Sequence, residues 1–561
     1  MVVRVNKLVY IFDVLKSKKW LWCLGIIVIA QLLLITPFFH RGLFMSHDNV
    51  QVIRIFEMFQ SLKYGGFPSY WNSGLLFEFG YPLFSFYPPM VYLIGSLFVF
   101  LGINYLMATK LVFILGFIVG ACGIFLLARK IFKYDSVAFV SSVVYSLSPY
   151  RAVDVYVRGA LAEFFAFSLM PWVIWINICF WEEKSNLRKI RILMLLSFSL
   201  AVLILTHNLS ALILLFLLFP LNVYYFFTIK KNAKSNLFKV FLSGVLTLIL
   251  TCYYWFPIII ESLIVRLGSF SRFRYDLNFQ TLNQLWDSPW GFLGSNQVDG
   301  MSLVLGKTII VFSIVALIIN NLKKTKIRGF INTLAGCAIV LIFFETSYSS
   351  FIWERATFLH FLQFPWRLHT VISIILSLLT GSFLFFLRQA RALIYVVLFL
   401  FIASVVFFEN YSYFKQARFS DKPYAAETTT WNDEYLPIWV MEKPANSAID
   451  KIWIASGSGE IRNIEWGYLE KHFVSESSEM SVITIAHVYY PGWQVYINDK
   501  NTDIQFFNKY GLMTINVPPG NNRISFIFQK TWYRQFSINV SLFGVILIFI
   551  FLFKKIGDEQ I

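Results

Sequence analysis

The chain has 561 residues, of which 57% are hydrophobic and only 14% are charged, and its formal net charge is +17. A water-soluble protein of this length could not bury so much apolar surface, so the composition excludes a soluble globular fold. Apolar runs of about 17–25 residues recur along the chain, and a helix of this length crosses a bilayer. The sequence therefore predicts a polytopic α-helical membrane protein.

The positive charge is concentrated beside the apolar runs. About half of the lysines and arginines lie in seven short clusters: Arg4–Lys19, Arg129–Lys133, Lys184–Arg191, Lys230–Lys239, Lys323–Arg328, Arg388 with Arg391, and Lys554–Lys555. Cytoplasmic loops of membrane proteins are enriched in lysine and arginine, so these clusters indicate membrane orientation. We expect membrane lipids, and no nucleic acid, as partners of the basic residues.

Thirteen apolar runs follow one another, but the charge pattern indicates that one of them does not cross the membrane. They cover about residues 20–39, 84–103, 108–128, 136–149, 164–181, 192–206, 209–229, 240–260, 305–320, 330–344, 368–387, 392–408 and 536–553. If all thirteen crossed, the cluster at Arg129 and every later cluster would lie outside. If residues 84–103 do not cross, all clusters fall on one side. We therefore expect about twelve transmembrane helices, with the N- and C-termini in the cytoplasm.

The first outer loop, about residues 40–107, is predicted to contain two juxtamembrane helices. Apolar residues recur at helical spacing at Val52, Ile55, Phe56, Phe59 and Leu62, and Gln51, Arg54, Gln60 and Lys63 fall largely between them. This pattern is typical of an amphipathic helix at the membrane interface. The Pro88-Pro89 pair begins the second helix, Tyr87 to Leu101, which we expect to lie on the membrane or to re-enter it.

An ionisable pair, His47-Asp48, precedes the amphipathic helix in the stretch "SHDNV". Asp48 could cap that helix, since aspartate is a preferred N-cap residue. Alternatively, Asp48 could be a carboxylate in a water-filled cavity beside the membrane, where it accepts a proton or holds a metal ion. His47 would then tune Asp48 or act as a second ligand.

The second outer loop, about residues 150–163, carries four charged side chains in a short connection: Arg151, Asp154, Arg158 and Glu163. They could form a surface ion-pair cluster, or the acids could be catalytic residues beside Asp48. His207 stands at the end of a later apolar run, where it is either a hydrogen-bonded interfacial residue or a supporting residue of the site. Arg151 is a second candidate supporting residue.

Arginines at the outer membrane boundary are candidate phosphate ligands. Arg367 follows Pro365 in "FPWR", where it could extend to lipid headgroups or bind a lipid-linked phosphate through its fork of donors. Arg158 could do the same in the second outer loop. Arg272 and Arg274 lie in the long outer loop, about residues 261–304, and are further candidates.

The composition changes after residue 410. The segments "WQVYIN", "LMTINV" and "RISFIF" are rich in β-branched and aromatic residues, and turn signals separate them. We expect three parts: a transmembrane domain (1–409), an extracytoplasmic antiparallel β-sandwich-like domain (410–535), and a last transmembrane helix with a cytoplasmic tail (536–561). The β domain shows no catalytic constellation, which favours a structural or acceptor-orienting role.

Several of these motifs together resemble one family of bacterial and archaeal membrane proteins, labelled pyruvoyl-tetrahydropterin-synthase-related. They are "SHDNVQVIRIFEMFQSLKYGGFPSYWNSG", "FGYPLFSFYPPMVYLIGSL", "SPYRAVDVYVRGALAE", "THNLSAL" and "FPWR". The stretch "YYPGWQVYIND" also resembles the C-terminal region of YfhO-like proteins. The pterin label does not describe an activity of this chain, because all five cysteines lie in apolar segments and no Cys/His metal site of such a synthase is present.

Both groups are similar to the GT-C glycosyltransferases, which carry an acidic residue in the first outer loop, followed by a "PP" juxtamembrane helix. This resemblance implies an inverting enzyme that moves a sugar from a polyprenyl-phosphate donor to a cell-envelope glycan or lipid acceptor on the outer face. Asp48 matches the first-loop acid, and Asp154 matches a second acid more loosely. GT-C members differ in metal use, so the cofactor stays open; a divalent cation (Mg²⁺ or Mn²⁺) held partly by Asp48 is one alternative.

Two other functions remain open from the sequence. A transporter or flippase of a lipid-linked glycan would need alternating access and often shows internal repeats, and no such repeat is evident. A non-catalytic envelope assembly protein would use the β domain to bind partners. Neither alternative requires the acids of the first two outer loops to do chemistry.

Overall fold

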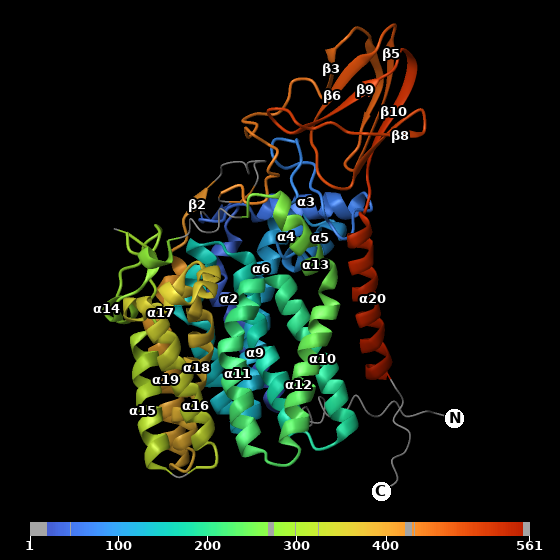
Figure 1. Cartoon of the computed structure of the whole chain (residues 1–561). Helices are drawn as coiled ribbons and strands as arrows, with labels where there is room; N and C mark the ends of the chain where they lie inside the picture. The colour runs from blue at the N-terminus through green and yellow to red at the C-terminus, as the bar shows by residue number, and fades with distance from the viewer. Residues whose placement is uncertain are drawn as a thin grey trace.

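A helical bundle, a layer of short helices across one end of it, and a β domain beyond that layer make up the molecule (Figure 1). The computed structural model describes residues 19–44, 46–267, 274–297, 299–323, 325–420, 429–430 and 432–553. The basic N-terminal cluster up to residue 18 and the last cluster at 554–555 lie outside the described residues.

The bundle is built from the apolar runs. Its helices are α2 (Lys19–Leu34), α6 (Tyr105–Phe132), α7 (Asp135–Ser146), α9 (Leu161–Glu182), α10 (Asn186–Thr206), α11 (Asn208–Thr228), α12 (Ala233–Leu250), α15 (Lys307–Leu322), α16 (Arg328–Glu345), α18 (His369–Phe386), α19 (Ala392–Asn410) and α20 (Trp532–Phe553). Nine helices within the described residues are long and apolar enough to cross a membrane. A multi-pass helical architecture is thus confirmed, whereas the count of twelve stays a prediction, because α2, α7 and α15 are shorter.

The layer at the end of the bundle nearest the β domain contains α3 (Gln51–Lys63), α4 (Leu83–Phe86), α5 (Met90–Phe100) and α13 (Cys252–Glu261). Figure 1 shows α3 lying across the bundle rather than along it. The 11 residues of α5 extend about 16 Å at 1.5 Å per residue, roughly half of the hydrocarbon thickness. The apolar run at 84–103 therefore does not supply a helix of spanning length, as the charge pattern predicted.

The amphipathic helix α3 differs from its expected form on the polar side. Val52 and Ile55 are buried, as predicted, but the side chains of Gln51, Arg54 and Glu57 are also buried. Periodicity could not reveal this, because segments distant in sequence cover the polar face. A helix expected to present polar residues to water is therefore enclosed on both sides.

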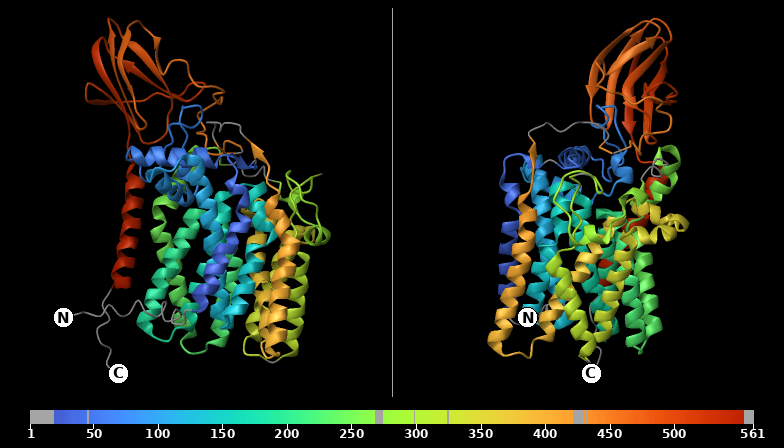
Figure 2. Two further views of the ribbon diagram at one scale, coloured as in Figure 1. Left: turned by 180° about the vertical axis from the view of Figure 1, so that it is seen from behind. Right: turned by 90° about the vertical axis from the view of Figure 1, so that its left-hand side faces the viewer.

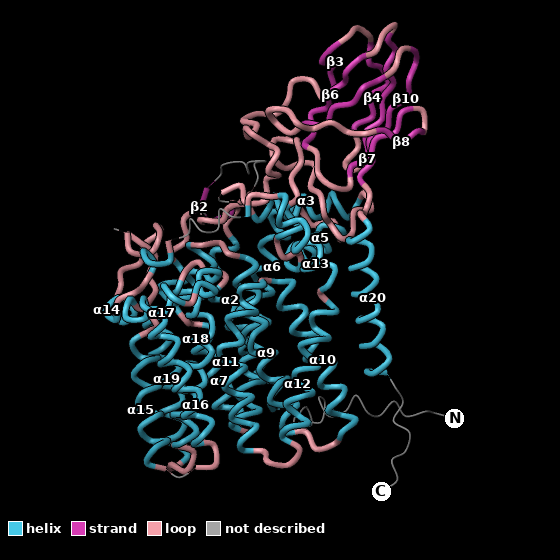
Figure 3. The backbone as a smooth tube through the Cα atoms, in the orientation of Figure 1, coloured by secondary structure: helices cyan, strands magenta, loops and turns pink. Residues whose placement is uncertain are grey.

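The β domain is an antiparallel sandwich, and this prediction is confirmed. One sheet has the order β4-β5-β10-β7-β8 and the other the order β3-β6-β9. The strands are β3 (Ile452–Ser456), β4 (Glu460–Trp466), β5 (Glu470–Ser477), β6 (Ser481–Val488), β7 (Trp493–Ile497), β8 (Lys500–Thr502), β9 (Leu512–Val517) and β10 (Gly520–Phe528). Alternate residues of β5 and β7 are buried, as expected where two sheets pack face to face. Figure 3 shows these strands grouped apart from the helices.

A buried ion pair connects the β domain to the last helix. The Arg534 side chain of α20 donates to Glu261 of α13 at 2.7 Å and to the Pro491 carbonyl of the β domain at 2.8 Å. Tyr490 donates to the second oxygen of Glu261. Since α20 runs from the β domain along the side of the bundle (Figure 2), this contact anchors the β domain to two helices at once.

A second contact joins the β domain to α3. The Tyr468 hydroxyl donates to Glu57 at 2.7 Å, and the backbone N–H of Gly74 donates to the same carboxylate oxygen at 3.3 Å. The other oxygen of Glu57 is buried without a hydrogen-bond partner among the described residues. Burial raises the pKa of Glu57 from 4.5 to about 7, and repulsion from Glu78 adds to this.

Glu57→Gln is expected to change the pH dependence of stability. Because the folded protein favours the neutral carboxyl group, the wild type loses stability as pH rises from about 4.5 to about 7, and the loss is complete above that value. Glutamine cannot ionise, so the variant should be more stable than the wild type at pH 8 by about 1–3 kcal/mol and similar at pH 5. Thermal unfolding of both proteins across this pH range measures the difference; parallel curves would refute it.

Candidate active site

Asp48 lies in the turn before α3 but does not cap the helix. The N-cap residue is Val50, and no side chain accepts a hydrogen bond there. Instead, the backbone N–H groups of His47 and Asp48 donate to the carbonyls of Val157 (3.0 Å) and Arg158 (2.9 Å). The capping alternative is therefore wrong, and the first outer loop is bound directly to the second.

The two outer loops approach each other closely at Gly159. This residue has φ +64°, and a Cβ atom there would lie 2.2 Å from the Ser46 hydroxyl oxygen. Only glycine avoids both the left-handed strain and the collision. The half-buried Asp48 side chain is consequently held next to the loop that carries the other predicted acids.

Four of the predicted site residues form one buried charge cluster: Asp154, Arg158, Glu163 and Arg367. Asp154 belongs to η3 (Val153–Val157), and Arg367 belongs to η9 (Pro365–Leu368) at the start of α18. Arg158 contacts Asp154 at 2.5 Å and Glu163 at 2.8 Å, and Arg367 contacts Glu163 at 3.2 Å. All four side chains are buried. The expectation of a surface ion-pair cluster is therefore wrong, because α18 and α9 enclose these charges.

Aromatic residues complete the surroundings of this cluster. Tyr150 donates to Glu163 at 2.7 Å, and the Arg158 guanidinium lies 4.6 Å from the centre of the Trp366 ring. Both oxygens of Glu163 thus accept hydrogen bonds, whereas one oxygen of Asp154 is buried without a partner among the described residues. Such an unsatisfied carboxylate oxygen is costly unless water or a ligand contacts it.

Arg151 points away from this cluster. Its guanidinium lies 4.5–5.3 Å from the ring centres of Tyr145, Phe164, Phe117 and Phe167, and it donates weakly to the Ser168 hydroxyl at 3.4 Å. Cation–π contacts of this kind stabilise a buried charge without using its hydrogen bonds. Arg151 therefore supports the packing of the second outer loop.

The two predicted histidines have different surroundings. His207 caps α11, since its Nδ1 accepts from the backbone N–H of Ser210 at 3.2 Å. Burial lowers the pKa of His207 to about 3, so its imidazole is neutral beside Glu163 at physiological pH. His47 is exposed, and its Nε2 donates to the Phe292 carbonyl at 2.8 Å, which requires the Nε2–H tautomer or the charged form.

Arg274 of the long outer loop does not join the cluster. Arg274 is exposed and pairs with Asp276 at 2.6 Å. Arg272 lies outside the described residues. Of the predicted phosphate ligands that the structure describes, Arg158 and Arg367 lie together, on either side of Glu163.

Sequence reasoning missed a cation beside Phe292, the residue that His47 contacts. Arg418 is exposed, and its guanidinium lies 4.2 Å from the centre of the Phe292 ring. The carbonyl of Phe292 accepts the hydrogen bond from His47. The pairing of β1 (Leu43–Phe44) with β2 (Phe419–Ser420) brings it there. No local pattern signals this, because the two strands are separated by nearly 400 residues.

A cation at Asp48 would have few protein ligands. Within the described ranges, no three His, Cys, Asp or Glu side chains lie close enough to hold a metal ion together. Mg²⁺ is often held by one or two carboxylates together with substrate phosphates and water. The residues around Asp48 thus do not form a metal site by themselves.

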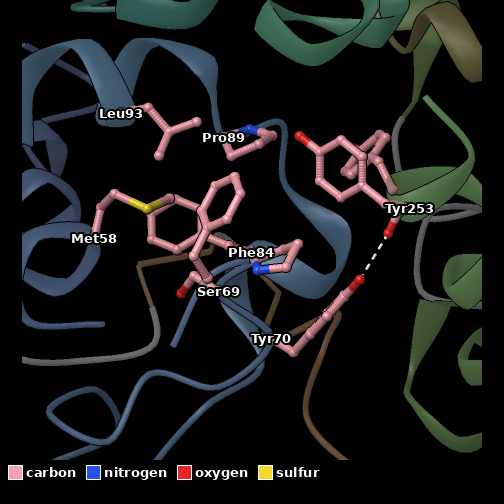
Figure 4. A pocket seen from close by; sticks show the side chains of 10 residues that line it. Met58, Ser69, Tyr70, Phe84, Pro89, Leu93 and Tyr253 are labelled. Atoms are coloured by element: carbon pink, nitrogen blue, oxygen red, sulfur yellow. Dashed lines mark hydrogen bonds between the residues drawn. The ribbon is translucent and has the colours of Figure 1, made fainter. Parts of the chain in front are cut away.

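A small pocket lies elsewhere in the outer layer (Figure 4). Residues of the first outer loop and of α13 line it, including Met58, Phe84, Pro89 and Tyr253. Tyr70 donates to the Tyr253 carbonyl at 2.9 Å across its edge. None of the predicted site residues lines this pocket.

The sequence matches a known family over most of the membrane domain. Residues 84–413, which are 330 of the 561 residues, match the family described as 6-pyruvoyl-tetrahydropterin synthase related domain, membrane protein. The chain belongs to this family. The resemblance expected from the motifs is thereby confirmed, and the matched region of this pterin-synthase-related membrane protein contains the whole buried charge cluster. No curated protein matches the sequence at a significant level.

Solved structures with a similar fold are membrane glycosyltransferases. Arabinofuranosyltransferase AftD from Mycobacteria is 14% identical with a TM-score of 0.46, covering 71% of this chain and 26% of AftD. The Archaeoglobus fulgidus oligosaccharyltransferase is 12% identical with a TM-score of 0.43, covering 73% of this chain and 57% of that one. ArnT from Cupriavidus metallidurans, bound to undecaprenyl phosphate, is 16% identical with a TM-score of 0.37, covering 70% and 64%. The chain spans about a quarter of the length of AftD and less than two thirds of the other two.

Proposed function

We propose that this pterin-synthase-related membrane protein is a GT-C-type inverting glycosyltransferase. It moves a sugar from a polyprenyl-phosphate donor to a cell-envelope glycan or lipid acceptor. The reaction takes place at the end of the bundle that carries the β domain, which is the outer face in our proposal, and both termini are cytoplasmic.

One observation carries this proposal. Asp48, a half-buried acid, is bound through its backbone to the second outer loop. That loop supplies Asp154, Arg158 and Glu163 to the buried charge cluster, and η9 supplies Arg367. Charged groups inside a membrane domain are costly and mark functional sites by default. An acid that can accept a proton, next to cations that can contact an anionic leaving group, suits transfer from a phosphate-linked donor.

The reaction would proceed as a single displacement. Asp48 takes the proton of the acceptor hydroxyl as the hydroxyl oxygen attacks the anomeric carbon. The bond between that carbon and the phosphate oxygen breaks, and polyprenyl phosphate leaves with the bonding electrons. Attack from the face opposite the phosphate inverts the anomeric configuration. Asp154 and Glu163 remain candidate catalytic acids, although Glu163 already accepts hydrogen bonds at both oxygens.

The leaving phosphate would be bound by Arg158 and Arg367. The second outer loop and η9 together contain three arginines, when Arg151 is included, and two acids. This region therefore has a formal charge of +1. Arg158 and Arg367 are both oriented by carboxylates, and a bidentate guanidinium suits phosphate. Arg272 and Arg274 stay weaker candidates, and Arg418, which lies over the Phe292 ring, is an additional one.

Purified protein with labelled polyprenyl-phosphate sugars tests the function directly. A transferase releases polyprenyl phosphate and labels an acceptor, whereas a flippase moves the intact lipid across proteoliposomes. An assembly protein does neither. Absence of released polyprenyl phosphate across a panel of donor sugars and envelope acceptors would overturn the proposal.

Arg367→Lys is expected to raise the KM for the donor by roughly tenfold. Arg367 Nη1 donates to Gln363 at 2.6 Å while Nε faces Glu163, so the planar fork reaches several partners at once. An ammonium group is a point charge and cannot reproduce this geometry. Steady-state kinetics with varied donor concentration measures the effect, with Arg462→Lys in the exposed Arg462–Glu460 pair of the β domain as the matched control. An unchanged donor KM in Arg367→Ala would show that Arg367 does not bind the donor.

A further inference from the structure

The first turn of α3 is connected to the second outer loop by a buried glutamine. Gln51 Nε2 donates to the Gly159 carbonyl at 2.9 Å and lies 3.4 Å from the carbonyl of Asp48. Its Oε1 accepts from the Tyr92 hydroxyl of α5 at 2.9 Å. One side chain therefore links three segments: the turn that carries Asp48, the loop that carries Arg158, and the helix after the proline pair.

The chain of contacts continues from Tyr92 towards the β domain. The Tyr92 hydroxyl accepts from Arg54 Nη1 at 3.1 Å. Arg54 also donates to the carbonyl of Thr429, and its Nε donates to the Thr429 hydroxyl at 3.3 Å. The Arg54 guanidinium lies 4.2 Å from the centre of the Tyr87 ring. Because Thr429 belongs to the segment that leads into the β domain, the start of α3 is connected to that domain.

All members of this chain are enclosed. Gln51, Arg54, Tyr92 and Thr429 are each at most 9% exposed. A buried donor or acceptor that loses its partner cannot turn to water, so each contact holds the next in place. The first turn of a helix also has backbone N–H groups without intrahelical partners, and here no side chain caps them. Packing through these three side chains is therefore what fixes the direction in which α3 begins.

The geometry points to a role for these residues in the reaction. We propose that Gln51, Arg54 and Tyr92 are positioning residues, which hold the Asp48 turn against Gly159 and transmit the position of the β-domain linker to it. The proposal rests on the proposed function for its catalytic consequence. The structural part of the proposal is that these residues fix the position of the Asp48 carboxylate, and this part does not depend on the proposed function. The charge of Arg54 also acts on Asp48 electrostatically, which adds to the hydrogen bonds.

Tyr92→Phe tests the proposal, because it removes only the hydroxyl that joins Gln51 to Arg54. The variant should stay folded and keep its donor KM while kcat falls by roughly three- to tenfold, the factor that one hydrogen bond contributes. Tyr70→Phe is the matched control. It removes another hydroxyl of the first outer loop, which donates to the Tyr253 carbonyl, away from the start of α3. If Tyr92→Phe is unstable, Gln51→Met breaks the same chain at its other member.

A second measurement does not depend on activity. Carbodiimide with glycine ethyl ester labels accessible carboxyl groups, and mass spectrometry of the full-length protein in detergent gives the labelling rate of Asp48. We expect this rate to rise by about three- to tenfold in Tyr92→Phe and not in Tyr70→Phe. Equal rates in the two variants would overturn the positioning role even if the protein is a transferase. If the wild type transfers no sugar, the proposed function fails while the labelling result still decides whether these residues position Asp48. In an active enzyme, faster labelling with unchanged kcat would overturn the catalytic part.

Discussion

Asp48→Asn is expected to lower turnover by roughly 10²–10⁴-fold while the protein stays folded. Asparagine keeps the size of the side chain and part of its hydrogen bonding but cannot accept the proton of the acceptor hydroxyl. The backbone contacts of this turn, His47 N–H to Val157 and Asp48 N–H to Arg158, do not involve the carboxylate. Because Val50 is the N-cap residue, loss of the charge also removes no helix cap. A turnover assay beside thermal unfolding of both proteins measures the effect.

Asp135→Asn is the matched control for this substitution. Asp135 is the first residue of α7, pairs with Arg129, and is removed from the outer loops by the length of α6. The same chemical change there should leave turnover within about twofold, since partly exposed ion pairs contribute little. Near-normal turnover in a well-folded Asp48→Asn protein would exclude Asp48 as the base and shift the proposal to Asp154. Repeating the wild-type assay with a chelator shows whether a cation takes part.

Arg534→Met is expected to destabilise the protein by about 3–5 kcal/mol. Arg534 and Glu261 are both fully buried, and the substitution removes the cation that pairs with Glu261 while its carboxylate keeps neutral partners such as the Tyr490 hydroxyl. An isolated charge in this position is costly, because neither water nor another cation replaces the guanidinium. The Pro491 carbonyl loses its donor as well. Unfolding of the full-length protein in detergent, monitored by temperature or denaturant, measures the loss.

Two further variants separate charge from packing. The double variant Glu261→Gln with Arg534→Met removes both charges and should recover much of the stability lost in the single variant. Arg462→Met breaks an exposed ion pair in the same β domain, with Glu460 at 2.6 Å, and should destabilise the protein far less than Arg534→Met, because solvent screens exposed pairs. A single variant that is no less stable than Arg462→Met would contradict the anchoring role of Arg534.

The sequence alone was sufficient for the class of protein and for several of its elements. Membrane insertion, the amphipathic helix at 51–63, the short helix after Pro88-Pro89 and the antiparallel β domain were all predicted from local patterns. These features depend on composition and periodicity over fewer than about 25 residues, and hydrophobic burial makes such patterns reliable. The motifs also placed the acids of the first two outer loops on one side of the membrane.

The tertiary structure decided how those side chains are used. Whether Asp48 caps its helix, and whether Asp154, Arg158 and Glu163 are exposed or buried, depends on segments that pack against them from elsewhere in the chain. Arg54 finds its partner Thr429 at a separation of 375 residues, and Glu57 finds Tyr468 at 411. The sequence does not distinguish a polar side chain that bonds to water from one whose hydrogen-bond partners lie in a distant segment. Burial by distant segments therefore separates a solvated charge from one held in a site, and only the folded chain specifies it.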